Sequence, residues 1–174
     1  MTFRSHPPAL RLGEATWGGA PPDPLAAPAL YEGLIWRRAL GYLVDVVLIA
    51  VLSVGLWFVA GVAGILSFGL LTPFGILALA ILPVAYHTYF LGQAGATPGM
   101  ALFDVEIRSW TGRRPDYTQA FLATVLFYIT VSLTAWLVLA VTLFNDRRRT
   151  LHDVLAGTLA VRRAGARSGF APAA

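Results

Sequence analysis

The chain has 174 residues, of which 57% are hydrophobic and 13% charged, with a mean hydropathy of +0.67 and a net charge of +4. A soluble domain of this length does not sustain such apolar runs, so the composition predicts one membrane domain, and the arginines beside those runs favour anionic lipid headgroups over nucleic acid as their partner. The absence of cysteine excludes disulfides, thiolate nucleophiles and cysteine metal sites.

The N-terminal segment differs from the rest of the chain. Residues 1–30 hold six of the eleven prolines and show no hydrophobic period, which predicts a disordered tail. The first apolar run begins only at residue 39, so we expect no signal peptide and a first span that stays as an anchor. Residues 164–174 are also predicted to be disordered, which leaves a membrane domain over 31–163.

Three apolar stretches are long enough to cross a bilayer, which takes about 20 residues of helix. Glycines and a proline divide the first long stretch, which predicts helices near 38–60 and 70–91. The third stretch carries no charge and predicts a helix near 119–144. The expected fold is therefore an all-α membrane protein with about three transmembrane helices.

Two short strands are predicted outside these helices, with a short interfacial helix before the second. Residues 103–108 alternate apolar and charged side chains, and residues 158–162 form the second strand. If the strands pair near the membrane surface, they lie on one side, and the third apolar stretch must re-enter. If that stretch spans once, the strands lie on opposite sides and the arginines divide almost equally between the two sides, which gives no orientation. Three spans is the leading prediction.

Asp45 is the one acid inside the first predicted span, where a carboxylate costs several kcal/mol unless it has a partner. Arg38 lies two helical turns earlier on the same face, about 10 Å away along the axis, and Gly41 lies between them. Two interpretations remain open. The acid either fixes helix packing through an ion pair or hydrogen bonds, or it is a protonatable or cation-binding site on a transport path.

Asp153 has local partners in the short helix near the C-terminus. Thr150 and Asp153 have the spacing of a capping box, and Arg149 lies four residues before the acid. Asp153 is expected to point away from the apolar face of its helix, which favours a cap over an ion ligand. His152 is a further polar residue beside it.

The sequence contains no motif of a known catalytic or metal site. No two histidines stand at ligand spacing, and no HExxH, GxSxG or Walker loop occurs. His87 and Tyr86 are expected to form part of an aromatic group at the membrane interface. We therefore predict no metal, no cofactor and no enzymatic activity.

Three segments in order resemble the RDD family of prokaryotic membrane proteins, named for one arginine and two aspartates. The segment RALGYLVD carries Arg38 and Asp45 in the named places, and RRRTLHDVLAGTLAV supplies Asp153 as the second aspartate. Between them, GATPGMALFDVEIRSWTG resembles the central Gly-x-Thr-x-Gly loop, which the resemblance places on Gly95, Thr97 and Gly99.

The resemblance implies a multi-pass protein of the bacterial inner membrane. Some members of the family have been linked to sodium or lithium for proton exchange, which implies monovalent cation/proton antiport in which Asp45 alternates between a proton and a cation. Arg38 would tune the acidity of Asp45 through its positive charge. The alternatives are a non-transporting accessory or scaffold subunit, as a homo-oligomer or with a membrane partner protein, and a lipid-handling role at anionic headgroups.

Overall fold

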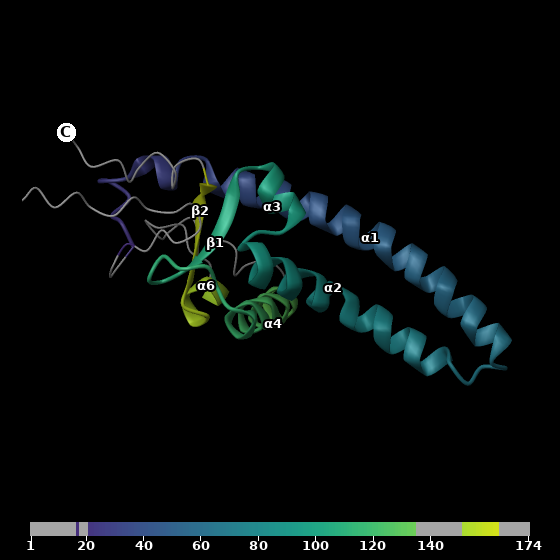
Figure 1. Ribbon diagram of the computed structural model, residues 1–174. Coiled ribbons are helices and arrows are strands. Elements are labelled where there is room, and N and C mark those ends of the chain that lie inside the picture. Colours follow the sequence, from purple (N-terminus) through teal and green to yellow (C-terminus); the bar gives the residue numbers. More distant parts are fainter. Residues whose placement is uncertain (1–16, 18–20, 135–150, 164–174) are drawn as a thin grey trace, which may run out of the picture.

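The computed structural model describes residue 17 and residues 21–134 and 151–163, and it is mostly helical. In chain order its elements are the 3₁₀ helix η1 (Pro28–Leu30), α1 (Leu34–Leu66), α2 (Thr72–Ala94), α3 (Pro98–Leu102), β1 (Val105–Ser109), α4 (Tyr117–Thr134), α6 (Leu151–Leu155) and β2 (Thr158–Arg162). Figure 1 shows two parts. A long hairpin of α1 and α2 projects from a smaller part that we call the head, which comprises the described residues of 21–45, 86–134 and 151–163.

The hairpin presents an apolar surface. In the most apolar window of α1 no residue is buried, and Trp57, Phe58 and Phe74 are each about two-thirds exposed at 67%, 67% and 66%. Soluble proteins rarely expose apolar patches of this extent, so the surface is of the kind that faces lipid. The part of α1 over residues 46–66 measures about 31 Å at 1.5 Å per residue, close to the thickness of a hydrocarbon core.

Small residues bring the two helices of the hairpin together. A Cβ atom added to Gly75 would lie 2.6 Å from the Cβ atom of Ala60, and one added to Gly64 would lie 2.9 Å from Oγ1 of Thr72. Glycines at such positions let helix backbones approach closely, as they do in membrane bundles. The hairpin therefore depends on the absence of side chains at these two points.

The first two predicted spans correspond to α1 and α2, although α1 begins at Leu34 and ends at Leu66, beyond both expected ends. In the part of the chain that the structure describes, these are the two helices long and apolar enough to cross a bilayer. The third expected span, near 119–144, begins as the shorter apolar helix α4, and its residues after 134 lie outside the described residues. A count of three spans is not confirmed.

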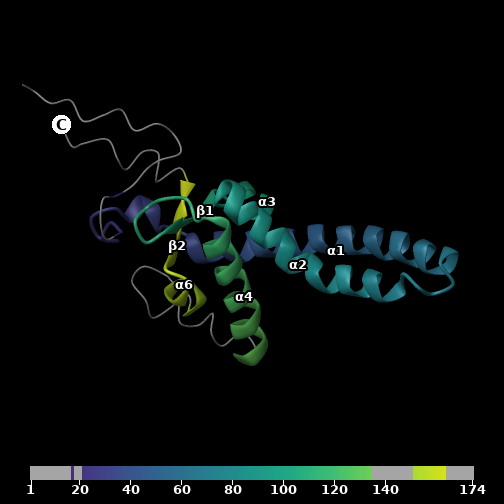
Figure 2. The same cartoon turned by 60° about the horizontal axis from the view of Figure 1, so that its bottom comes forward.

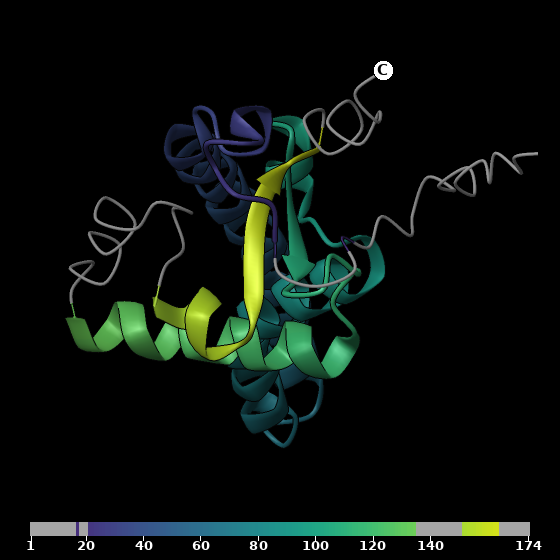
Figure 3. The ribbon, with the colours of Figure 1, turned by 90° about the vertical axis from the view of Figure 1, so that its left-hand side faces the viewer.

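The predicted strand pairing is confirmed. β1 and β2 pair antiparallel, with Val105 opposite Arg162 and Ser109 opposite Thr158. The first strand begins two residues later than expected, at Val105. Pairing places the end of β1 and the start of β2 side by side, and Figure 3 shows both strands on the head with α4 running across at the lower end of β2.

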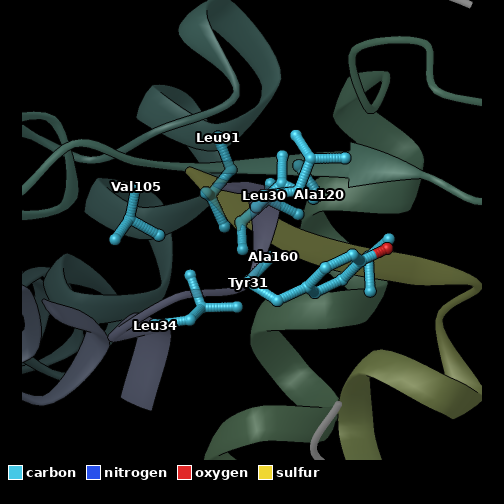
Figure 4. Close-up of a cluster of buried hydrophobic side chains, with 10 residues drawn as sticks. Leu30, Tyr31, Leu34, Leu91, Val105, Ala120 and Ala160 are labelled. Atoms are coloured by element: carbon cyan, nitrogen blue, oxygen red, sulfur yellow. The ribbon is translucent and has the colours of Figure 1, made fainter. Parts of the chain in front are cut away.

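The core of the head lies between the sheet, the first turn of α1 and the chain before it. Figure 4 shows this cluster, in which Leu30 and Leu34 pack with side chains from both strands and from α4. Its buried members are Leu30, Tyr31, Leu34, Leu91, Val105, Ile107, Ala120, Leu159, Ala160 and Val161. A two-stranded sheet buries little apolar area by itself, so segments from the rest of the chain must cover it.

The prediction of a disordered tail over 1–30 is wrong for residues 21–30. Leu30 is only 1% exposed, and the Tyr31 hydroxyl donates to the carbonyl oxygen of Pro22 at 2.9 Å. Upstream, the indole N–H of Trp17 donates to the carbonyl oxygen of Trp110 at 2.7 Å. The segment is held because it supplies apolar area that the small sheet needs. Residues 1–16, 18–20 and 164–174 lie outside the described residues.

Replacing Gly75 by alanine should destabilise the hairpin, because the new methyl group would collide with Ala60. Overpacking of this kind costs about 1–3 kcal/mol in free energy of unfolding. Gly61→Ala is the matched control, since an added Cβ there meets nothing within 4 Å. Thermal unfolding of the purified proteins in detergent checks this. Equal melting temperatures for the two variants would show that the helices are not in close contact at Gly75.

Candidate functional site

Asp45 lies on the buried face of α1, which also carries Leu34 and Gly41. These positions are spaced at seven and four residues, so they lie along one side of the helix. The Asp45 side chain is fully buried, whereas its neighbours Leu43 and Val46 are 60% and 41% exposed. The acid therefore points into the protein, away from the apolar outer surface of the hairpin.

Three donors surround the Asp45 carboxylate. The Tyr86 hydroxyl on α2 donates to Oδ1 at 2.8 Å, and the backbone N–H of Gly99 donates to the same oxygen at 2.9 Å. The Thr97 hydroxyl donates to Oδ2. Hydrogen bonds to a charged group contribute about 1.5–3 kcal/mol each. The carboxylate thus connects α1 to α2 and to the start of α3.

The start of α3 supplies two of these donors for a local reason. The first N–H groups of a helix have no partner within the helix, so the N–H of Gly99 is available to the carboxylate. Thr97 is the N-cap in an extended conformation, and its Oγ1 accepts from the N–H of Met100 at 3.2 Å while its own proton goes to Asp45. The hydroxyl therefore serves both the helix and the acid.

The glycines of the predicted Gly-x-Thr-x-Gly loop have separate roles. Gly95 ends α2 with a left-handed φ of 68°, where a glycine is favoured, and its carbonyl oxygen accepts from the N–H of Ile107 at 2.6 Å. Gly99 lies against α1, where an added Cβ would sit 2.1 Å from the carbonyl oxygen of Gly41. The close approach of Gly41 and Gly99 brings the loop within reach of Asp45.

Arg38 does not pair with Asp45. Its Nη1 donates instead to Oδ2 of Asp153 on α6 at 2.7 Å, and the side chains are 17% and 4% exposed. The Thr158 hydroxyl lies 3.4 Å from Oδ1 of the same aspartate. Side chains two turns apart on one helix lie about 10 Å apart along its axis, so a partner from another element reaches Arg38 first.

Asp153 lies in the first turn of α6 and points away from Val154 and Leu155, which are 44% and 60% exposed, as predicted. The side chain is buried, at 3% exposure of the residue, and faces Arg38 across the head. Arg149 and Thr150, its predicted local partners, lie outside the described residues, as does the side chain of His152.

Arg37, directly before Arg38 in the sequence, makes a third connection, which sequence reasoning missed. Arg37 Nη1 donates to the carbonyl oxygen of Phe103, where α3 leads into β1, at 3.0 Å. Tyr86 was also missed as a donor, because an aromatic residue near a helix end is typical of the membrane interface. Tyr86 and His87 are buried, at 7% and 5% exposure, so both side chains pack inside the protein, and their position at the membrane interface stays a prediction.

The arrangement favours structural hydrogen bonding over ion binding. Within the described residues, no group of three metal-ligating side chains is found, and no arginine lies within ion-pair distance of Asp45. The carboxylate oxygens already accept three hydrogen bonds. Three of its roughly four lone-pair sites therefore have a donor, which leaves little of the carboxylate for a cation.

Gly99→Ala should disrupt the contact between α1 and α3. The methyl group would meet the carbonyl oxygen of Gly41, and because that atom is backbone it cannot rotate away. The backbone shift would also break the hydrogen bond to Asp45, for a combined loss of roughly 3 kcal/mol or more. Gly55→Ala, where nothing lies within 4 Å, is the control. Chemical unfolding in mixed micelles measures both, and a wild-type midpoint for Gly99→Ala would contradict the contact.

The Arg38–Asp153 pair should be strongly coupled. Arg38→Met or Asp153→Leu alone leaves a poorly solvated charge and should cost on the order of 3 kcal/mol in free energy of unfolding, whereas the double variant should cost much less than the sum. Glu32→Gln is the control, because Glu32 is 79% exposed in its 3.8 Å pair with Arg162 and should change stability by under about 0.5 kcal/mol. Additive losses in the double-mutant cycle would show that the pair is not formed.

The family comparison agrees with this geometry. A family model described as the RDD family matches residues 33–157, a range that contains Arg38, Asp45, the Gly-x-Thr-x-Gly loop and Asp153. No curated protein and no solved structure matches the chain. The matched range covers most of the 174 residues and begins and ends within the described head. The chain therefore belongs to the RDD family.

Proposed function

We propose that this chain is a non-transporting accessory or scaffold subunit, a multi-pass protein of the bacterial inner membrane in which the RDD residues hold the fold together. The observation that carries this proposal is the set of three donors on the buried carboxylate of Asp45. The donors come from α2 and from the start of α3, so the acid on α1 is needed to assemble these three helices.

The position of Asp45 along α1 supports the same proposal. About 31 Å of apolar helix, residues 46–66, lies on one side of the acid, and the head lies on the other. Asp45 is therefore near one boundary of the apolar part, whereas the substrate and ion sites of transporters lie near the middle of the bilayer. A carboxylate near one boundary does not by itself connect the two sides.

The remaining features fit a subunit that is anchored and binds other proteins. The apolar hairpin provides the anchor, and its exposed face offers small and large apolar side chains to lipid or to a neighbouring membrane protein. The head carries a charged sheet on which Glu106 accepts from Arg108 at 2.7 Å and lies 3.5 Å from Arg163. These features require neither a cofactor nor a reacting group.

Monovalent cation/proton antiport is the second candidate, and one observation favours it. Asp45 is buried, yet its three hydrogen-bond partners are all uncharged, so its negative charge is not neutralised by a described side chain. Such a carboxylate would take up a proton or a monovalent cation if a path opened to it.

Proton flux in proteoliposomes separates the two functions. We expect purified wild type to show no sodium- or lithium-driven proton movement above that of protein-free liposomes, with an ionophore added at the end to show that the gradient was intact. Asp45→Asn keeps one oxygen to accept from Tyr86 and Gly99 and loses the charge, so it should fold with lower stability and, like wild type, show no flux. Cation-driven flux in wild type that is abolished in folded Asp45→Asn would overturn the proposal in favour of antiport. Co-purification of a stoichiometric membrane protein would support the accessory role.

A further inference from the structure

The strand pairing constrains how the chain can cross a bilayer. Ser109 at the end of β1 lies opposite Thr158 at the start of β2, so both strands lie on one side of any membrane. The start of α4 lies beside the end of α6, because the Gln119 amide donates to the carbonyl oxygens of Ala156 and Gly157 at 3.0 and 3.2 Å. The residues just after α6 therefore lie beside the first turn of α4.

The short length of chain between α4 and α6 disfavours a crossing by α4. Between Thr134 and Leu151 lie 16 residues, numbered 135–150. A helix needs about 20 residues to cross the hydrocarbon core, and non-helical backbone exposed to lipid leaves its polar groups unsatisfied. If α4 crossed the bilayer, these 16 residues would be fewer than a second crossing helix takes. The length therefore favours a head that stays, together with α4, on one side.

The direction of α4 agrees with this. Figures 1 and 2 show the hairpin lengthwise, whereas α4 is seen end-on in the first view and lengthwise across the hairpin in the second. Figure 3 looks along the hairpin, and α4 there runs across it. A hairpin that crosses the bilayer would thus leave α4 lying along the membrane surface.

The outer face of α4 is suited to lipid. Its inner face packs into the head through Ala120 and Thr124, which are 1% and 3% exposed, while Phe121, Leu122 and Ile129 are each about half exposed. The helix carries no charged side chain at all, so its outer face is not a surface for water. The apolar surface of the hairpin lies directly beside it, because α4 packs on α2 near His87 through Tyr128 and Phe127.

The arginines indicate on which side of the membrane the head lies. The sequence has no arginine or lysine between residues 39 and 107, and the turn of the hairpin at 67–71 carries no charge. Within the described residues all arginines lie in the head: Arg37, Arg38, Arg108, Arg113, Arg114, Arg162 and Arg163. Positive residues near membrane spans mark the cytoplasmic side, and they also favour its anionic lipids.

We propose that α4 lies along the cytoplasmic surface of the bilayer, with Phe121, Leu122 and Ile129 in the lipid, and that the described part of the chain crosses the membrane twice, through α1 and α2. The occupant of this face is the lipid bilayer. The proposal rests on the membrane location given above and is independent of whether the chain transports ions. It differs from the expectation of about three spans, in which the arginines divide between the two sides.

The depth of two positions on α4 tests the lipid contact. The chain has no cysteine, so nitroxide labels can be placed singly at Leu122→Cys and Ile129→Cys, which lie seven residues apart on one face. In vesicles of phosphatidylcholine and phosphatidylglycerol, we expect equal depths from oxygen and nickel-chelate relaxation. The control pair is Val47→Cys and Val54→Cys on α1, also seven apart and exposed, which should differ by about 10 Å in depth.

Three outcomes would overturn the proposal. A depth difference of about 10 Å between the α4 labels would show a spanning helix. Access of the nickel chelate to both labels, as in water, would show that the face does not contact lipid. Strong spin–spin coupling between copies, with low oxygen access, would show a second copy on this face instead of lipid.

The side of the membrane is tested with an impermeant maleimide on intact spheroplasts. We expect Leu70→Cys in the hairpin turn to react from outside, and Arg113→Cys and Arg148→Cys to react only after lysis. Reaction of Arg148→Cys from outside, with Arg113→Cys protected, would show that α4 crosses. Because this labelling measures topology alone, a positive flux assay would leave its result unchanged.

Discussion

The fold depends on hydrogen bonding to one desolvated carboxylate. Removing a charged group from water costs several kcal/mol, so a buried aspartate must find donors. Asp45 finds them on Tyr86, Thr97 and Gly99, which lie 41, 52 and 54 residues further along the chain. Satisfying the acid therefore requires α2 and α3 to be in place, which couples distant parts of the sequence to one position on α1.

The three residues that name the family do not form one site. Asp45 connects α1 to α2 and α3, whereas Arg38 connects α1 to α6 through Asp153. Arg37 adds a link to the corner between α3 and β1. All these links begin on the head end of α1, so this helix is both a membrane anchor and the element on which the head assembles. Such a division explains why an arginine and an aspartate seven residues apart have different partners.

Sequence reasoning found the features that depend on local pattern. Apolar length predicted α1 and α2, alternation predicted β1, and the loop pattern marked Thr97 and Gly99, which contact Asp45. It did not find what depends on three-dimensional neighbours. Helical periodicity places Arg38 and Asp45 on one face but says nothing of Asp153 or Tyr86, which come from other elements. The proline-rich segment before α1 gave no periodic signal, yet its apolar residues complete the core of a sheet too small to stand alone.

The backbone amide of Gly99 reports most directly on the central claim, because its N–H donates to the Asp45 carboxylate. Hydrogen–deuterium exchange of this amide, in detergent micelles, compares wild type with Asp45→Ala, and the amides of the hairpin turn serve as an internal reference. The account predicts strong protection of Gly99 in wild type and loss of that protection in the variant, with the reference amides unchanged. An amide of Gly99 that exchanges rapidly in folded wild type would contradict it.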